Sequence, residues 1–184
     1  EFILRPNTVY LADKACEDCD ELTSIEFKDN KLKKIGESCF KNCSSIESLS
    51  FNDESKLEEI GDYGFFGCIN LREIKALSVK KVGKGAFYDC VNLVSAEFPS
   101  ILEISEECFY NCKSLKFKER SINVGTAIGD RAFAYCTSMS DIVDMSGVTR
   151  IGAQAFIGCS SLKSVILPDT LKHMDEECFR DCVM

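Results

Sequence analysis

A phenylalanine followed three residues later by a cysteine recurs along nearly the whole chain, at intervals of 22 to 25 residues. An aliphatic residue stands eight positions before almost every one of these cysteines, and a small residue stands four positions before it. Such a unit cannot bury its apolar side chains alone, whereas stacked units form a continuous core. The repeat therefore predicts a solenoid of about eight coils. The cysteines that set its register are Cys19, Cys43, Cys68, Cys90, Cys112, Cys136, Cys159 and Cys182.

Each coil is expected to contain a short strand and a helical turn. The strand follows the cysteine, where apolar residues such as Leu162 and Val165 alternate with polar ones. The segment small-Phe-x-x-Cys has the spacing of a helical turn, and acidic residues such as Asp130 and Glu176 stand near its start, where a helix dipole favours them. The glycine that often follows the aliphatic residue, as Gly152 does, is expected to permit a tight turn.

The stretch from Val148 to Pro168, VTRIGAQAFIGCSSLKSVILP, shows the repeat in a regular form. It resembles the leucine-rich repeats of the BspA-like or treponemal type, whose repeat reads approximately L-x-x-I-G-x-x-A-F-x-x-C-x-x-L-x-x-I-x-L-P. The resemblance covers nearly the entire chain. It implies an α/β leucine-rich-repeat solenoid, a right-handed curved array of coils of 22–25 residues with a parallel sheet on the concave face. Residues 1–184 are expected to form one such solenoid.

Two repeats depart from the pattern. In the first, Cys16 takes the place of the phenylalanine. In the fifth, Lys118 and Arg120 fall where apolar residues are expected, and we predict a distorted strand there with Phe117 moved inward. The sequence ends at Met184, before the strand of its eighth repeat, and shows no polar terminal cap. We therefore expect a fragment of a longer array.

Composition and motifs exclude several classes of function. A formal net charge of −8 and a pI near 4.8 argue against nucleic acid and anionic lipid as partners, because phosphates require clustered Lys and Arg. No apolar run reaches the roughly 18 residues that span a bilayer, so no membrane insertion of this segment is expected. No G-x-S-x-G, Walker or H-E-x-x-H motif occurs. The one histidine, His173, is expected in a solvated loop. The alternative is that His173 acts as a catalytic base for Cys178.

The twelve cysteines allow three interpretations. An even number suggests disulfides in an extracellular protein. Their recurrence in a column instead favours free, buried, small apolar side chains, which is the interpretation we adopt. Finally, Cys16, Cys19, Cys39 and Cys43 have the spacing C-x2-C-x19-C-x3-C, close to that of a structural zinc site, and form a weak metal candidate.

The candidate ligand-binding residues are those that the strands would present on the concave face, five and seven positions after each cysteine. A contiguous patch on such a sheet suits a protein ligand. The last three pairs include apolar residues, unlike the first four. The set comprises Ser24, Glu26, Ser48, Ser50, Glu73, Lys75, Ser95, Glu97, Phe117, Glu119, Asp141, Val143, Ser164 and Ile166.

The resemblance implies a non-catalytic protein-binding module that needs no cofactor. Members of that family are typically surface or secreted proteins, so adhesion to, or recognition of, host or neighbouring-cell proteins is the expected function, with an extracellular-matrix protein as one possible ligand. An intracellular leucine-rich-repeat scaffold in the cytoplasm is the alternative. A thiol- or zinc-dependent enzyme is a more distant one.

Overall fold

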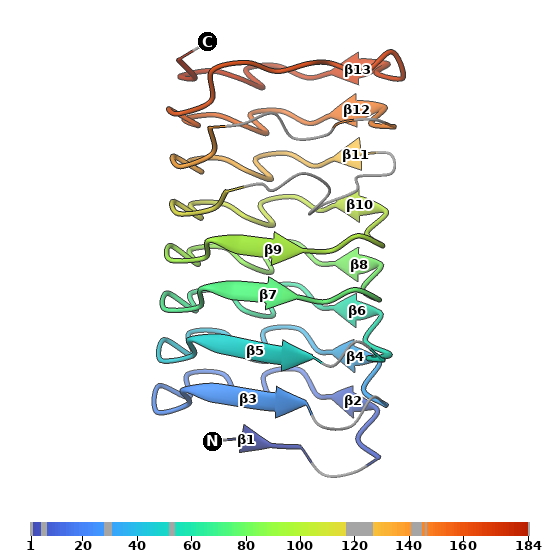
Figure 1. The fold of residues 1–184 in the computed structure, drawn as a ribbon, viewed down its shortest axis with the longest axis vertical. Coiled ribbons are helices and arrows are strands. Elements are labelled where there is room, and N and C mark those ends of the chain that lie inside the picture. Colours follow the sequence, from blue (N-terminus) through green and yellow to red (C-terminus); the bar gives the residue numbers. More distant parts are fainter. Residues whose placement is uncertain are drawn as a thin grey trace.

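The chain forms a stack of similar coils with two parallel sheets along its length, and its two ends lie at opposite ends of the stack (Figure 1). The computed structural model describes residues 2–4, 7–27, 31–51, 54–116, 127–140, 145 and 147–183. The predicted solenoid of stacked repeats with parallel strands is confirmed. The predicted distortion around Phe117 lies outside the described residues.

The longer sheet has eight two-residue strands, one from each predicted repeat. Every strand ends on the aliphatic residue that stands eight positions before the cysteine, so the repeat and the strand ladder share one register. Ile35 pairs with Ile60, for example, and Ile128 pairs with Ile151. The strands are β2 (Tyr10–Leu11), β4 (Lys34–Ile35), β6 (Glu59–Ile60), β8 (Lys81–Val82), β10 (Glu103–Ile104), β11 (Ala127–Ile128), β12 (Arg150–Ile151) and β13 (His173–Met174).

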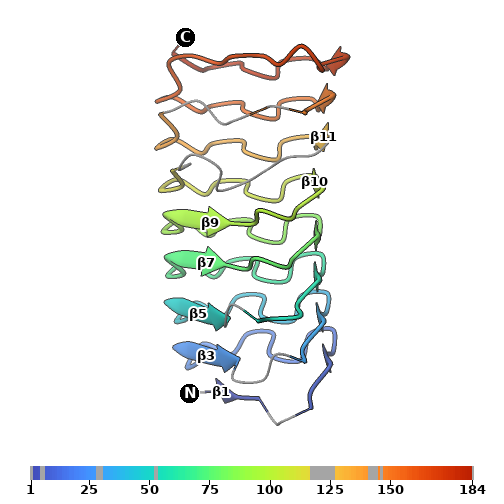
Figure 2. The ribbon, with the colours of Figure 1, turned by 45° about the vertical axis from the view of Figure 1, so that its right-hand side comes forward.

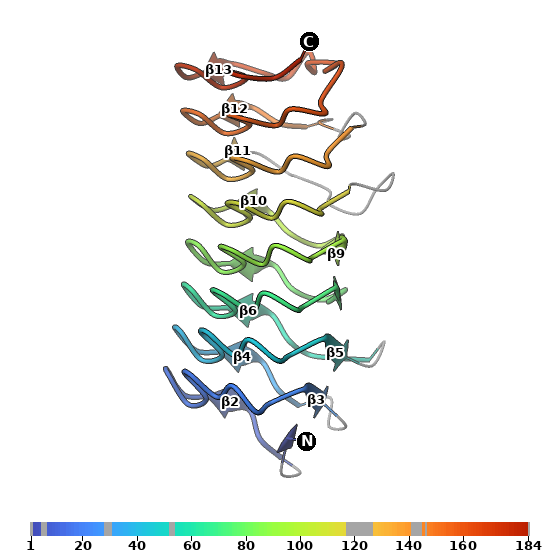
Figure 3. The same cartoon turned by 90° about the vertical axis from the view of Figure 1, so that its left-hand side faces the viewer.

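The shorter sheet has five strands in the order β1-β3-β5-β7-β9 and lies on a different side of the stack (Figures 2 and 3). Its strands after β1 are those predicted to follow the cysteines of the first four repeats. In the seventh repeat, residues 163–167 form no strand. The strands are β1 (Phe2–Ile3), β3 (Ser24–Phe27), β5 (Ser48–Phe51), β7 (Glu73–Lys75) and β9 (Ser95–Glu97).

The predicted helical turn is wrong: the described residues contain strands and turns but no helix. The backbone N–H groups of residues 85–90 alternate between two kinds of partner. Those of Tyr88 and Cys90 donate to carbonyls three residues back, whereas those of Phe87 and Asp89 donate to Cys108 and Tyr110 in the next coil. An α-helix would direct them all to carbonyls four residues back. In the described residues β-turns therefore take the place of the predicted helical turns within the predicted solenoid.

Two residues in the turn segment of each coil, between the aliphatic residue and the column cysteine, adopt the left-handed backbone conformation, which makes this chain of turns possible. One stands immediately before the column cysteine, and its φ lies between 58° and 70° in all eight coils. Left-handed backbone favours Gly, Asn and Asp, and all but one of these residues are of those types. They are Asp18, Asn42, Gly67, Asp89, Asn111, Tyr135, Gly158 and Asp181.

Asn111, with a φ of 59°, gives a test of this backbone. Its side chain donates a hydrogen bond to Asp89 at 2.6 Å. Asn111→Val and Asn111→Gly both lose this bond, but only valine carries a branched Cβ into left-handed backbone. We expect Asn111→Val to be less stable than Asn111→Gly by about 1–2 kcal/mol, measured by chemical denaturation. Equal stabilities would contradict the backbone assignment.

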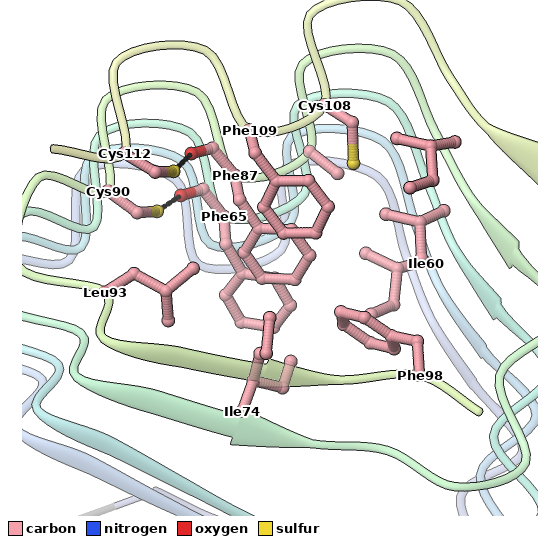
Figure 4. Packing of buried hydrophobic residues seen from close by; sticks show 14 of the residues in the cluster. Ile60, Phe65, Ile74, Phe87, Cys90, Leu93, Phe98, Cys108, Phe109 and Cys112 are labelled. Atoms are coloured by element: carbon pink, nitrogen blue, oxygen red, sulfur yellow. Dashed lines mark hydrogen bonds between the residues drawn. The ribbon is translucent and has the colours of Figure 1, made fainter. Parts of the chain in front are cut away.

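The core between the two sheets is built from columns of like residues. The phenylalanine rings of successive coils stack along the axis: Phe65, Phe87 and Phe109 have centroids 5.5 and 5.4 Å apart and planes within 6° of parallel (Figure 4). Beside them, the column cysteines from Cys43 to Cys182 each donate a thiol hydrogen bond to a backbone carbonyl of the preceding coil, as Cys90 does to Phe65 at 3.1 Å. The predicted burial of the phenylalanine column is confirmed from Phe40 to Phe156.

Candidate binding surface

The face of the five-stranded sheet carries the predicted ligand-binding residues, and the structure brings the first four pairs together. Parallel pairing places Ser24 beside Ser48, Ser48 beside Glu73, and Glu73 beside Ser95. A second row, two residues on, contains Glu26, Ser50, Lys75 and Glu97. Ser48, Glu73 and Lys75 are exposed, while Ser24, Glu26 and Glu97 are half-buried. We call these two rows the sheet face.

The inward side chains of the same strands hold the sheet face in position. Ile25, Ile74 and Ala96 are at most 2% exposed and alternate with the outward residues, as expected for strands with one buried face. At the end of β3 and β5, Phe27 and Phe51 stack with centroids 4.3 Å apart. Because a one-residue slip would bury the polar row, the register of the sheet face is strongly fixed.

Some predicted residues take other positions. Ser95 is only 6% exposed, although it pairs with Glu73 as the exposed Ser48 does. Ser164 and Ile166 are exposed but belong to no strand, so they do not extend the sheet face. Phe117, Glu119, Asp141 and Val143 lie outside the described residues, as does the side chain of Ser50.

The outer face of the eight-stranded sheet carries charges that pair with one another across coils. Glu59 on β6 lies 3.2 Å from both Lys34 on β4 and Lys81 on β8. Arg150 on β12 bridges Asp130 and Asp175 at 3.5 and 2.5 Å. Exposed pairs of this kind add about 0–1 kcal/mol each. They therefore favour the correct alignment of neighbouring coils.

The acidic residues at the start of the turns were expected to interact with a helix dipole. They instead form hydrogen bonds and ion pairs with the neighbouring coil. An oxygen of Asp62 accepts the backbone N–H of Lys84 at 2.9 Å, and an oxygen of Asp130 accepts that of Ala153 at 3.1 Å. The Glu106 carboxylate meets the Lys84 ammonium at 3.0 Å. These carboxylates therefore fasten each coil to the next.

An aromatic ladder, formed by Tyr63, Phe66, Tyr88, Tyr110 and Tyr135, was not found by sequence reasoning. Adjacent rings have centroids between 4.4 and 6.0 Å apart, and all five side chains are half-buried or exposed. Four of them directly follow a phenylalanine of the column or stand one residue further, so aligning the repeats would have revealed them. The Phe66–Tyr88 and Tyr88–Tyr110 pairs are stacked, whereas the Tyr63–Phe66 and Tyr110–Tyr135 pairs meet edge to face.

A hollow of about 400 Å³ lies at the corner between the two sheets. Serines of three successive coils line it, and two of them fasten the corner. The Ser78 hydroxyl donates to the carbonyls of Ser55 and Leu57 at 2.7 and 2.9 Å, and that of Ser100 donates to the Leu77 carbonyl at 2.8 Å. These hydroxyls are engaged with the backbone, and the hollow shows no grouping suited to chemistry.

The cysteines are free, and ten of the twelve are buried. Cys19 is exposed and Cys182 is half-buried, contrary to the prediction that the whole column is buried. Burial raises the pKa of the Cys39, Cys43 and Cys159 thiols to about 12. Such thiols remain protonated near neutral pH and are poor nucleophiles.

In the described residues, neither the four cysteines of the zinc candidate nor His173 forms a metal-binding or catalytic site. Among the described residues, no three His, Cys, Asp or Glu side chains are placed to hold a metal ion, and these residues include the four candidate cysteines. His173 is exposed and lies in strand β13, not in a loop. The Cys178 thiol donates to the carbonyl of Asp175 at 2.6 Å and to that of Gly152 at 3.3 Å. The described residues likewise include no helix long and apolar enough to cross a membrane.

The raised cysteine pKa values predict how stability depends on pH. A folded-state pKa above the unfolded value contributes stability that is complete below the unfolded pKa and is lost as pH rises through the folded pKa. The free energy of unfolding should therefore be constant from pH 6 to 8 and fall between about pH 9 and pH 12. Cys108→Ala tests this expectation, because burial also raises the pKa of the Cys108 thiol. The variant should fold, since Ala86, Ala132 and Ala155 occupy the same column. Denaturation at several pH values should show a shallower fall for this variant; an identical fall would contradict the assignment.

Two parallel sheets along a stack of 22- to 25-residue units define a leucine-rich-repeat solenoid. The family model of the BspA type leucine rich repeat region matches six copies, over residues 1–116 and 126–184. The chain therefore belongs to the BspA-type leucine-rich-repeat family. No curated protein matches the chain.

Solved structures show the same fold. A leucine-rich-repeat protein of T. pallidum is 22% identical, with a TM-score of 0.72 over 85% of this chain and 72% of that one. One from Bacteroides ovatus is 22% identical, with a TM-score of 0.68 over 98% of this chain and 52% of that one. A leucine-rich cell surface protein of Faecalibacterium prausnitzii is 19% identical, with a TM-score of 0.57 over 95% of this chain and 68% of that one. The chain thus spans about half to three-quarters of these relatives.

Proposed function

We propose that the chain is a non-catalytic module that binds a protein through its sheet face and serves recognition or adhesion at a cell surface. The observation that carries the proposal is the parallel register of β3, β5, β7 and β9, which places two adjacent rows of polar and charged side chains on one side of a rigid sheet. Repeat solenoids commonly use such extended surfaces for binding. The surface location is supported by the family and by the F. prausnitzii relative, which is described as a cell surface protein.

The charge of the sheet face suggests the chemistry of the partner. The sheet face carries three acidic residues, Glu26, Glu73 and Glu97, and one basic residue, Lys75. The formal net charge of the whole chain is −8. Complementary charge speeds encounter and selects partners. We therefore expect a protein partner that presents basic side chains, such as an extracellular-matrix protein, and an association rate that falls as salt rises.

Charge reversal on the sheet face tests the proposal. Immobilised fibronectin, laminin and collagen are the probes, and binding is measured by surface plasmon resonance at two salt concentrations. Glu73→Lys with Glu97→Lys should weaken binding by about tenfold or more at low salt. Glu103→Lys with Glu176→Lys makes the same change in charge away from the sheet face and should leave affinity within about twofold. Failure to bind any probe, or equal losses in the two variants, would overturn the proposal.

A further inference from the structure

The first coil contains a pair of cysteines that no other coil has. Cys16 replaces the phenylalanine of the column, so the repeat reads Cys16-Glu-Asp-Cys19. In the other seven coils a phenylalanine stands three residues before the cysteine. Cys19 occupies the cysteine column, where the other cysteines serve as small apolar side chains. Nothing in the repeat accounts for a second thiol at position 16.

The backbone holds these two residues close enough for a disulfide. The N–H of Cys19 donates to the carbonyl of Cys16 at 3.3 Å, which closes a four-residue β-turn. Asp18, the third residue of the turn, has the positive φ of 59° that a type II turn requires. The Cα atoms at the ends of a β-turn lie within about 7 Å, and a disulfide needs about 4.4–6.8 Å.

The Cys16 and Cys19 thiols differ in their exposure to solvent. Cys19 is exposed, whereas Cys16 is 7% exposed. The pKa of the Cys16 thiol is raised, chiefly by burial and then by the neighbouring Cys19. A reagent from solution therefore reacts first with Cys19, because Cys16 is less accessible.

The thiols of the adjoining coil are already engaged. The Cys43 thiol donates to the Cys16 carbonyl at 2.9 Å, which holds it against the backbone of the first coil. Cys39 is fully buried. Burial raises the pKa of both thiols to about 12, so they supply few thiolates near neutral pH.

We propose that Cys16 and Cys19 form a redox-active dithiol that reduces small disulfide compounds and closes into an intramolecular disulfide. The Cys19 thiolate attacks one sulfur of the compound RSSR, forms a mixed disulfide and releases RS⁻. The Cys16 thiolate then attacks the Cys19 sulfur, forms the Cys16–Cys19 bond and releases the second RS⁻. The two thiol protons end on the two RS⁻ groups, so one RSSR is reduced to two RSH while the dithiol loses two electrons. A reducing thiol reverses the reaction.

Oxidised glutathione is the probe that tests this dithiol on the chain of 184 residues. After incubation and acid quenching, intact mass and a non-reduced peptide map are recorded. The wild-type chain should lose the mass of two hydrogen atoms, retain no glutathione and show a Cys16–Cys19 link. Cys16→Phe, which restores the column residue, should instead retain one glutathione on Cys19. Cys19→Ser should not react, and Cys39→Ala should behave as the wild type.

Three outcomes would overturn the proposal: a wild-type chain that keeps glutathione, one that does not react, or a link from Cys19 to a cysteine other than Cys16. Loss of two hydrogen atoms by Cys16→Phe would do the same. Circular dichroism establishes that each variant is folded. Cys16→Ala replaces Cys16→Phe if the larger side chain prevents folding, with the same expected glutathione adduct.

Discussion

Replacing Phe109 with alanine is expected to lower the free energy of unfolding by about 3–5 kcal/mol, the cost of removing a buried aromatic side chain. Phe109 is fully buried, and its ring stacks between those of Phe87 and Phe133, each 5.4 Å away and within 6° of parallel. No neighbouring ring can fill the cavity without leaving its own place in the column. Chemical denaturation followed by circular dichroism measures the loss.

The adjacent residue provides the matched control. Tyr110 is half-buried and stacks on Tyr88 at 4.4 Å within the aromatic ladder. Tyr110→Ala should cost about 1 kcal/mol, the value of an exposed aromatic pair. If Tyr110→Ala destabilised the chain as much as Phe109→Ala, the division of the turn into an inner column and an outer ladder would be wrong.

The columns could be predicted from the sequence because each one is repeated. The phenylalanine and cysteine positions predicted the coil length, the stacking and the strands that follow the first four cysteines, but not the eight-stranded sheet, whose strands end on the aliphatic residue. The turn was misassigned because small-Phe-x-x-Cys satisfies the spacing of a helical turn and of consecutive β-turns equally. The residue before the cysteine contained the missing signal: Asn42, Gly67 and Asp89 are typical of left-handed backbone and poor in a helix interior.

The candidate surface was predicted less completely than the core. Counting five and seven residues from the cysteine identified Ser48, Glu73 and Lys75, which are exposed on the sheet face. The same count failed at Ser95, which is buried, because alternation within one strand does not determine how far surrounding residues cover a side chain. It also failed in the seventh coil, where Ser164 belongs to no strand. Surface positions are set by contacts between coils, which spacing within one repeat does not describe.

Replacing Gly129 with alanine is expected to cost about 2–3 kcal/mol, the effect of overpacking a close contact. The glycine after the aliphatic residue was predicted to permit a tight turn, but Gly129 is not in left-handed backbone. A Cβ there would lie 2.6 Å from the Glu106 nitrogen and 2.8 Å from the Ser105 carbonyl carbon, both backbone atoms of the preceding coil. The glycine therefore allows adjacent coils to approach.

Gly64→Ala separates this effect from the general cost of replacing a glycine. Its Cβ would meet the flexible Ile60 side chain at 3.0 Å and the Gly61 carbonyl oxygen at 3.1 Å. Alanine already occupies the equivalent position in the first, fourth, sixth and seventh coils. We expect a change within about 1 kcal/mol by chemical denaturation, since this column accommodates a methyl group. A larger loss of stability for Gly64→Ala than for Gly129→Ala would mean that the glycine after the aliphatic residue is not needed for the close approach of adjacent coils.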